Sequence, residues 1–165
     1  MRPLIPDKLN GRLDEIVTKC FEGNRIMDRG MTILSVKFAM NKTESLLHPK
    51  LAHLYPLLAD KVSEFQGSRN NLTFYGVTPA DGSDYGKPLD FFEKILSYMN
   101  DLETLVSDVM DESREEDPVS YVFLEGFLRE LIPVTNQCLL LVDKAEFFSD
   151  QIMLFDMAVE DFIIL

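Results

Sequence analysis

The two histidines of this 165-residue chain lie close together, at His48 and His53, in a segment whose apolar spacing predicts a helix over residues 46–67. Asp60 and Glu64 follow on the same segment, seven and eleven residues after His53, so these three side chains fall along one stripe of a helix. Imidazole and carboxylate groups are common protein ligands for iron and similar metals. The segment therefore predicts a metal site with His48, His53, Asp60 and Glu64 as candidate ligands.

A stripe of His, Asp and Glu is also typical of the water-facing side of a helix, so a solvated face is the competing interpretation. A full di-iron centre in a helix bundle needs Glu-x-x-His pairs on two helices, and the sequence contains no such pair. A complete site of that kind is excluded. Other carboxylates on the predicted helices are expected at the surface rather than as ligands: Glu15, Glu22, Glu103, Glu125 and Glu130.

The sequence gives little support to covalent catalysis or nucleotide binding. It contains no GxSxG motif, no Walker loop and no dinucleotide-binding fingerprint. Cys20 and Cys138 are far apart, form no CxxC motif and fall on apolar helix faces. We expect both to be small buried hydrophobic residues, and no catalytic residue is assigned.

The order of elements predicts an all-α fold. Long helices are expected over residues 7–40, 46–67, 90–111 and from 118 to about 155, where Gly23 and Gly30 mark either close helix packing or a local break. Pro56 should kink the second helix or divide it.

Residues 68–89 form the one long irregular segment, and Tyr75 and Tyr85 are expected to anchor it. A single domain over residues 1–165 follows, a four-helix bundle in which the long connection crosses the bundle and leaves the second and third helices parallel. A loop that covers a small-molecule site is a further hypothesis, based only on its length.

The net charge of −12 argues against binding to nucleic acids or anionic membranes, because it repels phosphate groups. No apolar run is long enough to span a bilayer, and the first residues have no signal-peptide core. We therefore expect a cytoplasmic protein with no nucleic-acid or membrane partner.

The segment from Phe38 to Val62 resembles the Dps-type mini-ferritins of the ferritin-like superfamily. The resemblance is carried by Phe38, Leu47-His48, Tyr55 and Val62. It implies a ferritin-like four-helix bundle, a homo-oligomer, iron as the metal, and oxidation of iron by dioxygen or peroxide.

The iron ligands of that family are only partly retained. His48 matches a ligand position, whereas the register places Val36, Ser63 and Gly67 where the family has His, Asp and Glu. Asp60 and Glu64 repeat the spacing of the lost pair about one turn earlier. Two functions stay open: iron binding, oxidation or storage at a shifted or degenerate site, and a non-catalytic bundle that serves as an oligomeric scaffold or interaction module.

Overall fold

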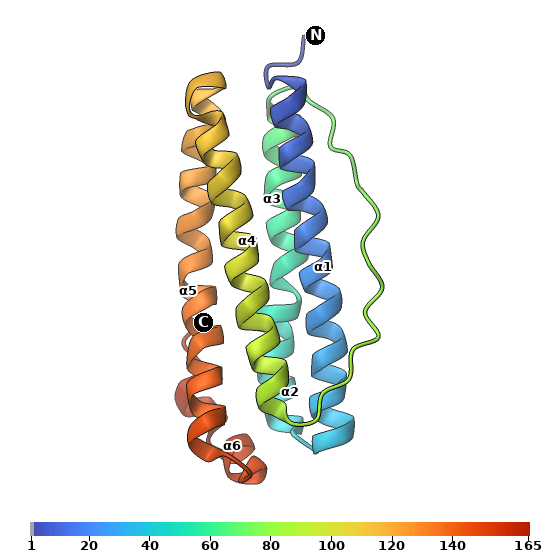
Figure 1. Cartoon of the computed structure of the whole chain (residues 1–165), viewed down its shortest axis with the longest axis vertical. Helices are drawn as coiled ribbons and strands as arrows, with labels where there is room; N and C mark the ends of the chain where they lie inside the picture. Colours follow the sequence, from blue (N-terminus) through green and yellow to red (C-terminus); the bar gives the residue numbers. More distant parts are fainter. Residues whose placement is uncertain (1) are drawn as a thin grey trace.

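Long helical segments lie side by side along one axis in the computed structural model, which describes residues 2–165 (Figure 1). The first, α1 (Asp7–Phe38), buries the apolar stripe predicted for it along its whole length. It runs through Gly23 and Gly30 without a break and ends where Ala39 takes a left-handed backbone with φ 57°. The predicted first helix is confirmed, and Gly23 and Gly30 are packing positions rather than a break.

The second predicted helix is divided, as the prediction allowed, but the division lies before Pro56 rather than at it. It consists of α2 (Asn41–Leu47), a π-helical turn η1 (His48–Ala52) and α3 (Leu54–Ser68). Pro56 lies in the first turn of α3, where a missing N–H costs no helical hydrogen bond. Residues 41–45, which lie between the first two predicted helices, are helical as part of α2.

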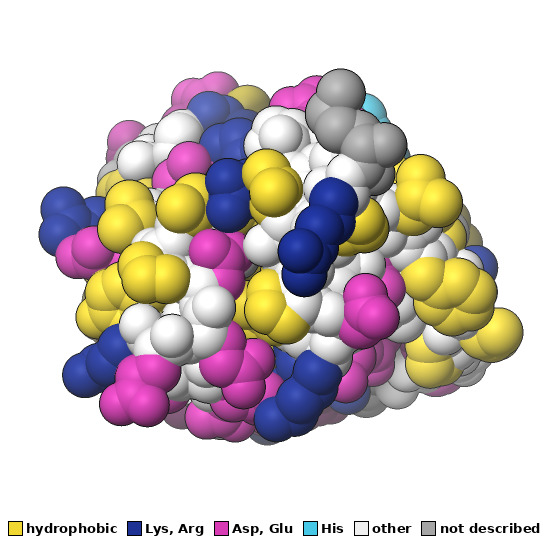
Figure 2. All heavy atoms as spheres, turned by 90° about the horizontal axis from the view of Figure 1, so that it is seen from above, with side chains coloured by type: hydrophobic (Ala, Val, Ile, Leu, Met, Phe, Trp, Pro, Cys, Tyr) yellow, Lys and Arg dark blue, Asp and Glu magenta, His cyan; other side chains and the backbone are white. Residues whose placement is uncertain are grey.

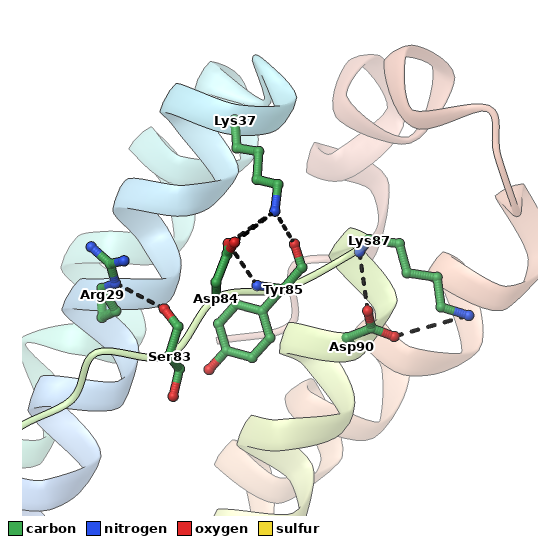
Figure 3. Close-up of polar contacts among 7 residues, drawn as sticks. All are labelled: Arg29, Lys37, Ser83, Asp84, Tyr85, Lys87 and Asp90. Carbon is green, nitrogen blue, oxygen red and sulfur yellow. Dashed lines mark hydrogen bonds and ion pairs between the residues drawn. The ribbon is translucent and has the colours of Figure 1, made fainter.

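A long irregular strap, residues 69–87, returns from the end of α3 to the start of α4 along the outer side of α1 (Figure 1). Arginine and lysine side chains of α1 hold it through its backbone oxygens. Arg29 Nε donates to Ser83 O at 2.9 Å, and Lys37 Nζ donates to Tyr85 O at 2.6 Å (Figure 3). Because the strap crosses the bundle, α3 and α4 run parallel, as predicted.

Tyr85 anchors the strap, as expected, whereas Tyr75 does not. The Tyr85 side chain is buried against Phe91, with 5.4 Å between the ring centroids. Tyr75 stays 58% exposed and touches only the edge of the bundle at Phe21, 6.2 Å away between ring centroids.

The second half of the bundle is a pair of long antiparallel helices, α4 (Pro88–Glu116) and α5 (Pro118–Phe148). Each begins with proline at its first position, where the fixed φ suits a helix start. Pro133 lies inside α5, which continues through it. The helix predicted to reach residue 155 instead ends at Phe148, because Ser149 adopts φ 49°.

The C-terminal segment packs back on the bundle as α6 (Ile152–Ala158) and the 3₁₀ turn η2 (Val159–Phe162). Phe155 and Phe162 enter the core. The fully buried Gln137 donates to Phe162 O at 2.9 Å and accepts from Ile164 N at 2.6 Å, so the last residues are tied to α5. No helix of the described part of the chain is both long and apolar enough to cross a membrane.

Two glycines of α1 let α4 approach closely. A Cβ at Gly23 would lie 2.4 Å from the Tyr98 ring, and a Cβ at Gly30 would lie 1.9 Å from the Phe91 ring. Both rings are almost completely buried, so they have no space in which to retreat. The packing of α1 on α4 therefore requires glycine at both positions.

Substitution of a glycine of α1 by alanine should have opposite effects at Gly30, which packs against α4, and at Gly11, which does not. Gly30→Ala is expected to lower the free energy of unfolding by about 1–3 kcal/mol, because the core is overpacked. Gly11→Ala is the matched control on the same helix, since a Cβ there meets nothing within 4 Å. It should raise stability by about 0.4–1 kcal/mol. Urea unfolding followed by circular dichroism measures both, and equal effects would contradict the close-packing argument.

Candidate functional site

The predicted histidines meet at the π-helical turn. The extra residue per turn brings the His48 and His53 rings within 4.9 Å, measured between centroids. His48 Nδ1 lies 3.0 Å from Glu44 Oε1, and His48 Nε2 lies 3.1 Å from Asp28 Oδ1. One imidazole thus connects α1 to α2 through two carboxylates, at a half-exposed position on the outside of the bundle.

Asp60 and Glu64 lie elsewhere. Asp60 is seven residues past His53, which is about 10 Å along a helix axis. Both carboxylates are exposed, on the water-facing side of α3. The structure therefore brings His48 and His53 together and leaves Asp60 and Glu64 as a separate exposed pair, one helical turn apart.

The remaining candidate carboxylates are at the surface, as expected, and each is bonded to another side chain. Glu22 pairs with Lys19 at 3.0 Å and Glu125 with Arg129 at 2.7 Å. The same holds for Glu15 with Arg12, Glu103 with Thr135, and Glu130 with Lys61.

The middle of the bundle is occupied by sulfur and aromatic groups. Each of the long helices contributes one or two fully or almost fully buried residues: Cys20 from α1, Tyr55 from α3, Tyr98 and Met99 from α4, and Cys138 from α5. The Tyr55 hydroxyl donates to Met99 Sδ at 3.2 Å, and the Tyr55 and Tyr98 rings meet edge to face at 5.4 Å. The Tyr98 hydroxyl donates to Lys19 O at 2.6 Å.

Burial controls the protonation of this core. It raises the pKa of Cys20 to about 12 and that of Cys138 to about 12, because a thiolate would lose its hydration there. Burial also raises the pKa of Tyr55 well above its usual value, and the nearby thiols Cys138 and Cys20 add to the effect. These groups remain neutral at physiological pH.

Comparison with known proteins gives no match to any family model and none to a curated protein sequence. Solved structures do match. A humanized archaeal ferritin superposes with a TM-score of 0.85 at 15% identity, covering 98% of both chains. An open pore ferritin from the archaeon Archaeoglobus fulgidus gives a TM-score of 0.82 at 14% identity, covering 93% of this chain and 94% of that chain. A Chlorobium tepidum ferritin gives 0.81 at 13% identity, covering 96% of this chain and 99% of that chain.

The chain has the ferritin-like fold. At these identities the similarity establishes the fold alone. A di-iron centre in such a bundle needs inward-facing Glu and His side chains from several helices. Within residues 2–165, the buried polar and charged side chains include no Glu and no His. Nor does this part of the chain hold a group of three or more His, Cys, Asp or Glu residues suited to a metal ion. The residues in the middle of the bundle do not fit a di-iron centre.

Sequence reasoning did not identify Asp28 and Glu44 as partners of His48. Glu44 had a usable signal, because it lies four residues before His48 and a helical turn places such residues side by side. Asp28 had none, because its contact depends on how α1 packs against the chain 20 residues later.

The buried thiols should react slowly with Ellman's reagent at pH 8. A pKa raised from 9.0 to about 12 lowers the thiolate fraction about a thousandfold, and burial hinders access further. The measurement compares the rate for native protein with that in 6 M guanidinium chloride, where both thiols should react at once. Rapid release of two equivalents from the native protein would show that the middle of the bundle is open to solvent.

Proposed function

We propose that this protein is a non-catalytic ferritin-like subunit, a bundle that self-associates and acts as an oligomeric scaffold. One observation carries the proposal. Where a redox bundle would hold carboxylates and imidazoles, this chain packs Cys20, Tyr55, Met99 and Cys138. These buried, neutral groups suit stability rather than the binding of Fe²⁺ or Fe³⁺, which in such bundles needs carboxylate and imidazole ligands.

Exposed apolar side chains support self-association. On the strap, Leu72 is 90% exposed and Val77 is 93% exposed, with Phe74 between them at 71%. Seen from above, apolar side chains gather at the right of the molecule, the side on which the strap runs (Figure 2). Clustered exposed apolar groups of this kind are typical of protein interfaces.

Net charge and the two free thiols bear on the partners and the cellular compartment of this protein. The net charge of −12 disfavours nucleic acid as a partner, because assembly would concentrate negative charge further. Two buried free cysteines suit a reducing compartment, and we place the protein in the cytoplasm.

Iron oxidation and light scattering test the scaffold proposal together. We expect purified protein to oxidise Fe²⁺ no faster than buffer at pH 7, and to elute as a defined oligomer well above 18.9 kDa. Leu72→Asp with Val77→Asp should reduce the oligomer mass while leaving the helical circular dichroism unchanged. Turnover of iron above the buffer rate, or a monomer at micromolar concentration, would refute the proposal.

A second candidate function is iron binding at the surface, favoured by one observation. His48 lies between two carboxylates with His53 beside it, so a divalent cation could replace the proton between His48 Nε2 and Asp28 Oδ1. Asp60 and Glu64, one helical turn apart on α3, are the second pair of exposed candidate ligands. In this reading the protein is an iron-binding member of the fold whose ligands have moved to the outside.

Single substitutions distinguish these positions. If the histidine pair binds Fe²⁺ or its analogue Co²⁺, His48→Ala and His53→Ala should weaken binding at least tenfold in anaerobic titrations. Asp60→Ala and Glu64→Ala should weaken binding in the same titrations if the carboxylate pair holds the ion instead. Asp101→Asn, an exposed carboxylate on α4 and away from both pairs, is the control. Binding that is unchanged in all four variants would rule out this candidate.

A further inference from the structure

A small, partly open pocket lies beneath the strap, with α1 on one side and α4 on the other. Its volume is about 160 Å³. Its apolar walls come from Ile26, Pro79 and Ala80, and its polar groups include Asp81, Ser83 and Lys94. The pocket is separate from both the middle of the bundle and the histidine pair.

Asp81 presents a buried carboxylate oxygen that nothing satisfies. Its Oδ1 accepts from Ser83 N at 2.8 Å, whereas its Oδ2 is buried and has no hydrogen-bond partner among the described residues. A buried polar atom left unsatisfied costs about 1–3 kcal/mol, so the Asp81 oxygen marks a position at which a hydrogen-bond donor is missing.

One carboxylate oxygen, Asp81 Oδ2, and one ammonium group of the pocket have no partner among the described residues. Glu22 also lines it, but Lys19 pairs with that carboxylate at 3.0 Å. Lys94 has no ion pair within residues 2–165 and reaches the pocket from α4. The strap thus offers an unpaired carboxylate oxygen and the facing helix an unpaired ammonium group. A ligand that carries both charges would pair with both.

We propose that this pocket binds a free α-amino acid with a small aliphatic side chain. Its ammonium group donates to Asp81 Oδ2, and its carboxylate accepts from Lys94 Nζ. The aliphatic side chain packs against Ile26, Pro79 and Ala80. Recognition of this kind requires both charged groups on one molecule, so it distinguishes an amino acid from a simple amine or a simple acid.

The site is preformed because the strap is fixed on both sides of it. Arg25 Nη1 donates to Thr78 O at 2.9 Å before the pocket, and Lys37 pairs with Asp84 at 2.9 Å after it. The strap therefore loses little conformational entropy when a ligand binds, which favours affinity for a small ligand. The proposal does not depend on the scaffold function.

Ligand-observed NMR with the full chain tests the proposal. The probes are the L-amino acids, screened singly, followed by calorimetry of the best binder. We expect an aliphatic amino acid to bind with a dissociation constant below 1 mM. Its methyl ester and its deaminated acid should each bind at least tenfold more weakly, because each lacks one charge.

Variants locate the binding. Asp81→Asn and Lys94→Gln should each weaken it at least tenfold, whereas Asp101→Asn, an exposed carboxylate on the same helix as Lys94, should not change it. Circular dichroism confirms that each variant is folded. Lack of binding by every amino acid at 10 mM would show that the pocket holds water only and would overturn the proposal. Binding that survives both pocket substitutions, or an ester that binds as well as its amino acid, would also overturn it.

Discussion

The close approach of α1 to α4 is the constraint on which the rest of the molecule depends. Gly23 admits the Tyr98 ring and Gly30 admits the Phe91 ring, and neither ring would fit against a Cβ. Tyr98 then positions Tyr55 in the middle of the bundle. Phe91 forms the surface on which Tyr85, and with it the strap, is seated. Two missing side chains thus determine the packing of the interior and the course of the longest loop.

The interior shows that a ferritin-like bundle can keep its fold without the residues of a di-iron centre. A ferritin-like bundle needs a filled centre for stability, and sulfur and aromatic side chains fill it as well as ligands with bound metal would. Burial that raises thiol pKa values to about 12 keeps these groups protonated and unreactive. The polar groups considered as binding sites lie instead outside the core, at the π-helical turn and beneath the strap.

Helical periodicity was sufficient to predict the architecture, because each long helix buries one continuous stripe. The parallel arrangement of α3 and α4 also followed, since only a long connection can return the chain to the same end of the bundle. The division at His48 was not predictable in the same way. Pro56 predicted a kink or a division at its own position. The helix is instead interrupted by the π-helical turn at His48–Ala52, which packs against α1.

The polar sites were harder to predict for a related reason. The sequence brought together His48, His53, Asp60 and Glu64 because they share one segment, but the spacing along a helix separates the histidines from the carboxylates by about 10 Å or more. The contact between His48 and Asp28 and the pocket beneath the strap both join residues far apart in sequence. No local pattern encodes such contacts.

The strap also sets a minimum length for this chain. Nineteen residues, 69–87, connect the two ends of the bundle. Fully extended they reach about 63 Å, and a bundle built on the 32-residue α1 is about 48 Å long. The slack is therefore only about four or five residues. Insertions in this segment should be tolerated as extra loop, whereas deletions beyond that slack would leave α4 unable to begin where it does. Among natural variants of this chain, the strap should lengthen far more readily than it shortens.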